Sequence, residues 1–151
     1  MSIYYVTNKK PLSHNKRGSN DQYKIEFQNE FNEKYAHLYT EYSLPLSKVP
    51  LKSCIVYIHQ CRPGNIPDVD NLSKPIVDAF TGLIYEDDKL IVKRSAIILK
   101  LSDFDFSTVD ATDMPIEILE AFDEYYTNQE KHLILFGVDT IEINTIKVGE
   151  I

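Results

Sequence analysis

Residues 67–88 read PDVDNLSKPIVDAFTGLIYEDD, and this stretch combines a helical pattern with six acidic side chains. Its apolar residues Leu72, Ile76 and Phe80 recur every four positions, which is the spacing of one face of an α-helix. Gly82 follows as a typical C-terminal stop. The pattern predicts a helix that begins at residue 70 or 73, ends at residue 81 and buries one side.

The other side of this predicted helix carries charge. Asp70, Lys74 and Asp78 fall within about 80° of one another when each residue turns about 100°. Pro75 disfavours helical geometry at Lys74, which leaves open whether the regular helix begins at residue 70 or residue 73. The apolar face on the opposite side gathers the two carboxylates and the lysine on one exposed face.

Further acids stand at both ends of the stretch. Asp68 and Asp70 flank Val69 after a proline, and in an extended segment period-two geometry points both carboxylates to one side. Asp87 and Asp88 precede a long β-prone run, where a return of the chain would bring them beside the first pair. Clustered carboxylates repel one another unless a hard cation such as Mg²⁺ lies between them. Such an ion activates water and stabilises charge on a phosphodiester.

Outward from this stretch, β-prone and helical segments alternate along the chain. The predicted strands are 3–6, 51–60, 90–101, 133–136 and 140–148, with a turn at residues 137–139 between the last two. The other predicted helices are 21–42 and 115–127. This alternation indicates an α/β or α+β domain.

The charge of the chain is unevenly distributed. Its 151 residues have a formal charge of −7, which by itself argues against a nucleic-acid partner. Residues 1–62, however, hold nine basic and five acidic side chains, whereas residues 101–151 hold two and twelve. The acidity therefore belongs to the last third. The candidate phosphate contacts lie in the basic N-terminal stretch: Lys9, Lys10, Lys16 and Arg17.

No stretch of the sequence predicts membrane association. The N-terminus, MSIYYVTNKK, lacks the apolar run of a signal peptide. No apolar run approaches the ~20 residues that a spanning helix needs. We therefore expect a cytoplasmic protein with no membrane contact.

The acids, the lysine and the glycine together form a longer pattern, D-x-D-N-x-x-K-x-x-x-D-x-x-x-G-x-x-x-x-D-D, from Asp68 to Asp88. Its eight defined positions in 21 residues resemble the RusA family of Holliday junction resolvases. The resemblance implies a small, homodimeric, Mg²⁺-dependent endonuclease of bacteria or their prophages, acting in DNA recombination and repair. It also implies a mixed β-sheet flanked by helices.

The resemblance is clear over about residues 50–101. We therefore expect residues 1–101 to form a RusA-like core. Residues 102–151 are expected to form an acidic extension, a helix and a β-hairpin, packed on the same domain.

Carried over position by position, the resemblance implies roles for the residues of the pattern. Asp68, Asp70 and Asp88 would bind Mg²⁺, with Mn²⁺ as an alternative ion, and Asp87 would share that role. Lys74 matches the essential lysine, so the expected catalytic residues are Asp68, Asp70, Lys74 and Asp88. Asn71 and Asp78 would support the ligands and the lysine, for example through hydrogen bonds.

Two alternatives to a junction resolvase are open at this point. One is a binding protein with the same fold but no nuclease activity, in which the acidic last third contacts a basic partner or mimics DNA. The other is a Mg²⁺-dependent nuclease for another branched DNA, such as a flap or a replication fork. The motif does not separate these substrates.

Overall fold

The computed structural model describes residues 1–11, 20–60, 66–100 and 109–141. Four strands form one mixed sheet: β1 (Ser2–Thr7), β2 (Leu51–His59), β3 (Ile91–Lys100) and β4 (His132–Thr140). The helices are α1 (Asn20–Lys34), α2 (Val69–Ala79) and α3 (Ile116–Thr127). Short 3₁₀ turns, η1 (Ala36–Tyr39) and η2 (Asp88–Leu90), follow α1 and precede β3. This arrangement confirms the predicted α+β fold with a mixed sheet flanked by helices.

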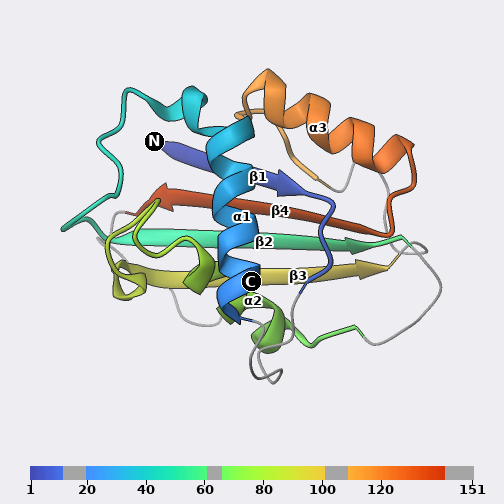
Figure 1. Cartoon of the computed structure of the whole chain (residues 1–151), viewed down its shortest axis with the longest axis horizontal. Coiled ribbons are helices and arrows are strands. Elements are labelled where there is room, and N and C mark those ends of the chain that lie inside the picture. The colour runs from blue at the N-terminus through green and yellow to red at the C-terminus, as the bar shows by residue number, and fades with distance from the viewer. Residues whose placement is uncertain (12–19, 61–65, 101–108, 142–151) are drawn as a thin grey trace.

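The strand order is β1-β4-β2-β3 (Figure 1). β4 is antiparallel to both of its neighbours, and β3 is parallel to β2. A parallel pair needs a crossover connection, and α2 lies on that connection. β3 is therefore an edge strand, and its charged and exposed side chains are typical of a protected sheet edge.

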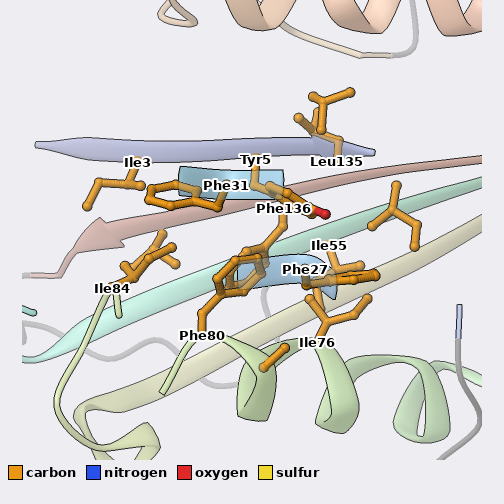
Figure 2. Close-up of a cluster of buried hydrophobic side chains, with 14 of the residues drawn as sticks. Ile3, Tyr5, Phe27, Phe31, Ile55, Ile76, Phe80, Ile84, Leu135 and Phe136 are labelled. Atoms are coloured by element: carbon orange, nitrogen blue, oxygen red, sulfur yellow. The ribbon is translucent and has the colours of Figure 1, made fainter. Parts of the chain in front are cut away.

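The main core lies between the sheet and the helices α1 and α2. The Phe80 ring, at the end of α2, stacks on Phe136 of β4 with ring centroids 5.2 Å apart. Tyr5, Phe27 and Phe31 surround it, and all five rings are buried (Figure 2). These contacts hold the C-terminal end of α2 against the centre of the sheet.

α3 packs elsewhere, against β1 and β4. Ile118 and Phe122 are its buried side chains. Leu135 of β4 is buried and points away from the Phe80 cluster (Figure 2). No helix in the described part of the chain is long and apolar enough to cross a membrane.

The start of α2 differs from the sequence-based expectation. The helix begins at Val69, so the extended geometry expected for residues 68–70 and the alternative start at residue 73 are both wrong. The reason is a helix cap: the Asp68 carboxylate accepts a hydrogen bond of 2.9 Å from the Asn71 backbone N–H. Pro75 lies inside the helix, where it cannot donate a backbone hydrogen bond. Its side chain is buried with the apolar face, and this burial offsets the missing bond.

The turn expected at residues 137–139 is also wrong. These residues lie within the single strand β4 and pair with β1 on one side and β2 on the other. Gly137 allows the Tyr4 ring to pack closely against the strand, because a Cβ at this position would lie 3.3 Å from that ring. β4 thus supplies a central strand, and most of the second strand expected at 140–148 lies outside the described residues.

Candidate active site

α2 presents a charged row on the side away from its buried residues. The Lys74 ammonium forms an ion pair of 3.4 Å with the Asp78 carboxylate one turn later. Asp70 stands one turn before Lys74 and is exposed. Both members of the ion pair are nearly half exposed, so the pair adds little to stability and stays accessible to a ligand. The expected row of Asp70, Lys74 and Asp78 is present.

The chain after α2 returns to this row. The Gly82 backbone, with φ of +88°, adopts the left-handed conformation that favours glycine, and its N–H donates to the Tyr85 carbonyl at 2.7 Å. The buried Tyr85 hydroxyl donates to the Val77 carbonyl of α2. These bonds fix the loop on the helix and bring Asp88 back toward α2.

Asp88 lies among the charged groups of α2 and β3. Burial raises the pKa of its carboxyl, and hydrogen bonds with Asp87 and then Asp78 raise it further. The Arg94 guanidinium of β3 lies 3.9 Å from the Asp88 carboxylate. The Asp78 and Asp88 carboxyl groups are therefore close neighbours, with a cation on either side.

Asp87 has a different environment. Its carboxylate caps η2 by accepting a 2.9 Å hydrogen bond from the Lys89 backbone N–H. That bond lowers the pKa of Asp87. Asp87 is exposed and its ionised form is favoured, whereas the ionised form of Asp88 is disfavoured.

A hollow of about 390 Å³ opens between α2 and β3 beside these groups. Its lining residues are Val69, Asp70, Ser73, Lys74, Arg94 and Ala96. The buried Ser73 hydroxyl has no hydrogen-bond partner within the part of the chain that the structure describes. The hollow therefore combines an acid and two cations, which suits a phosphate group and its counter-ion.

Arg94 is a site residue that sequence reasoning missed. It pairs with Ser53 in the β2–β3 register, and Ser53 is buried on the face that α1 and α2 cover. The side chain therefore points toward α2 although its neighbours Lys93 and Ser95 point to the other face. Only the register of β3, set by pairing with a distant strand, reveals this direction.

Asp68 lies at the opposite end of α2 from Asp78. It caps the N-terminus of α2, ten residues before Asp78, which is about 15 Å along the helix axis. Asn71 is in the first turn of the helix, and its backbone N–H donates to Asp68. Among the described residues no group of three or more His, Cys, Asp or Glu side chains is placed to hold a metal ion.

The donor set nevertheless fits Mg²⁺. This ion usually binds one or two protein carboxylates and keeps waters that a substrate phosphate displaces. The neighbouring Asp78 carboxyl contributes to the raised pKa of Asp88, and an added cation would relieve the repulsion between the two ionised groups. Oxygen ligands in a shallow, water-accessible site are the environment that the ion requires.

The expected DNA contacts fall into two groups. Lys9 and Lys10 follow the end of β1, and the Lys9 backbone N–H donates to the Thr7 hydroxyl at 3.1 Å. Lys10 lies near His132, whose pKa is lowered by burial first and then by His59 and Lys10. Lys16 and Arg17 lie outside the described residues.

Comparison with known proteins adds an independent finding. A family model described as endodeoxyribonuclease RusA matches residues 22–104. The match covers 83 of 151 residues, more than half of the chain, and contains every position of the pattern from Asp68 to Asp88. No curated protein matches the chain.

Proposed function

The chain belongs to the RusA family of endodeoxyribonucleases, and from this premise we propose that it is a Mg²⁺-dependent nuclease that resolves four-way DNA junctions by paired, symmetric nicks. The observation that carries the proposal is the return of Asp88 to the charged row of α2. The loop after α2 brings this carboxylate to Asp78 and Arg94, beside the hollow that Lys74 lines.

The proposed roles follow from this geometry. Asp88 would hold the ion together with Asp70, as the family resemblance implies, or with Asp78, whose carboxyl contributes to the raised pKa of Asp88. When bound, Mg²⁺ supplies a more acidic water and neutralises charge on the phosphodiester. Lys74 and Arg94 would hold the scissile phosphate and stabilise the charge that develops on its oxygens.

The other residues of the pattern would bind or support the ion. Asp68 would share the ion with Asp70, as the resemblance implies, and its cap on α2 also orients the turn that carries Asp70. Asp87 would hold η2 in place next to Asp88 through its bond to Lys89. Lys9, Lys10, Lys16 and Arg17 would contact DNA phosphates outside the site.

Paired nicks also need two sites in one complex. A two-fold homodimer would present two identical sites to strands of like polarity, so we propose that the active species is a homodimer. Sedimentation of the protein bound to a four-way junction should give two chains per junction.

The substrate class is tested by offering three DNAs of equal arm sequence: a four-way junction, a flap and a linear duplex. We expect Mg²⁺-dependent cleavage of the junction at a rate at least tenfold above that of either other DNA. Preferential cleavage of the flap would favour the nuclease for other branched DNA. Tight junction binding without cleavage at any Mg²⁺ concentration would favour the non-catalytic binding protein.

A further inference from the structure

α3 packs mainly against β1 and β4. On the face of the sheet opposite α1 and α2, the exposed side chains Lys52, Cys54, Lys93 and Ser95 lie near the N-terminal ends of β2 and β3. Ile58, further along β2 on the same face, is buried. A hollow of about 350 Å³ lies on the open part of this face. Its lining residues are Ser2, Tyr4, Lys52, Ser53, Cys54, Lys93, Ser95, Gly137, Val138 and Asp139.

The charge of this region is opposite to that of the whole chain. β2 and β3 together carry Lys52, Lys93, Arg94 and Lys100 and no acidic residue, in a protein of net charge −7. A local basic surface of this kind sets where an anion approaches, because the field near the surface follows the nearest charges. A polyanion would therefore approach the protein most readily at β2 and β3.

Lys52 and Lys93 are paired directly across the two strands and point to the same face. Like charges in this arrangement destabilise a sheet unless something neutralises them. Asp139 stands opposite Lys52 in the register, but its carboxylate pairs with the N-terminal ammonium at 3.5 Å. Within the described residues neither lysine has an ion-pair partner.

The lysine pair also lies just across an edge strand from the candidate active site. Arg94 follows Lys93 in β3, and successive strand side chains point to opposite faces about 3.3 Å apart along the strand. Arg94 therefore faces the hollow of Asp70 and Lys74, and Lys93 faces the open side. A polyanion that crosses the edge of β3 would contact both Lys93 and Arg94.

We propose that the open face around Lys52 and Lys93 binds the sugar–phosphate backbone of the DNA substrate, continuing the contact from the active site around the edge of β3. This inference rests on the proposed nuclease function. The lysine ammonium groups would bind phosphate oxygens, and the Ser95 hydroxyl would donate to the same groups. A second copy of the chain is a poorer occupant, since a two-fold contact centred on this hollow would place the lysine pair against its own copy.

The test is binding of a four-way junction by the full-length Lys52→Gln/Lys93→Gln variant, measured by fluorescence anisotropy in Ca²⁺ across a salt series. Each phosphate contact contributes about −0.9 to the slope of log affinity against log salt. We therefore expect affinity to fall about tenfold per lysine at 0.1 M salt, and the slope to decrease by about 2 in the double variant.

Two control variants separate this effect from general loss of charge. Lys24→Gln removes a cation from α1, on the other face of the sheet, and should leave the affinity unchanged. Asp139→Asn removes the one acid of the hollow and should strengthen binding. Wild-type affinity and slope in the double variant would overturn the proposal, as would a change in oligomeric state without a change in DNA affinity.

A second readout uses the exposed Cys54 thiol inside the hollow. In a Cys61→Ser background, junction DNA should slow maleimide labelling of Cys54 at least fivefold, and the double lysine variant should lose this protection. Equal labelling with and without bound junction would contradict the proposal while leaving the nuclease function intact. Failure of the wild-type protein to bind or cut any branched DNA would instead contradict the nuclease function.

Discussion

Replacing Asp88 with asparagine is expected to reduce Mg²⁺-dependent junction cleavage about a thousandfold. A metal-held charge is worth several kcal/mol in the transition state, and each ~1.4 kcal/mol is a factor of ten in rate. Asparagine keeps the shape of the side chain but removes the charge that holds the ion. The measurement is single-turnover cleavage of a labelled junction at saturating protein.

The same variant should fold at least as well as the wild type. Burial first, and then the neighbouring Asp87 and Asp78 carboxyls, raise the pKa of Asp88, so its ionised form is destabilised in the folded protein. Thermal unfolding of Asp88→Asn should therefore give an equal or higher midpoint. A loss of cleavage together with a lower midpoint would mean that the substitution acts through folding.

Matched substitutions locate the second ligand of the ion. Asp123→Asn, an exposed acid on α3, makes the same change in charge and should cleave like the wild type. If Asp70 shares the ion with Asp88, Asp70→Asn should lower Mg²⁺ affinity and rate more than Asp78→Asn does. The reverse order would assign the ion to Asp78. Wild-type rates in Asp88→Asn would contradict the assignment of the site.

Replacing Phe80 with alanine is expected to destabilise the protein by about 3–5 kcal/mol, as truncation of a fully buried ring usually does. Its ring is fully buried and packs on Phe136 and Tyr5 at centroid distances of 5.2 and 5.0 Å. The ring anchors the end of α2 and the loop that returns Asp88, so partial loss of cleavage should accompany the loss of stability. Urea unfolding measures the first effect.

Two controls accompany this substitution. Phe80→Leu keeps much of the buried volume and should destabilise the protein by less than half as much. Ile116→Ala removes a side chain that is 65 % exposed and should change the free energy of unfolding by less than about 0.5 kcal/mol. A change below about 1 kcal/mol for Phe80→Ala would show that the aromatic cluster does not anchor α2.

The sequence predicted α2 and its two faces well because the information is local. Leu72, Ile76 and Phe80 are buried, and Asp70, Lys74 and Asp78 form the exposed row, as four-residue spacing requires. The first turn could not be predicted in the same way. Two aspartates separated by one residue are equally compatible with an extended segment and with a helix cap, and only the Asp68–Asn71 hydrogen bond decides between these two structures.

The features that the sequence did not predict depend on contacts between distant segments. Gly137 resembles a turn residue in isolation, yet it lies in a central strand because the Tyr4 ring packs against it. Arg94 resembles an ordinary edge cation until the register with β2 directs it toward α2. The proximity of Asp78 and Asp88 likewise depends on the bonds of Gly82 and Tyr85, which a pattern of acids does not reveal.

The most direct test of the proposed activity is to map the cleavage products of a four-way junction on a denaturing gel, with the wild-type protein in Mg²⁺ and in EDTA. We predict two nicks at symmetric positions on opposing strands in Mg²⁺, none in EDTA, and recovery when Mg²⁺ is added in excess. Cleavage that persists in EDTA, or an intact junction at every Mg²⁺ concentration despite tight binding, would contradict a metal-dependent nuclease site between α2 and Asp88.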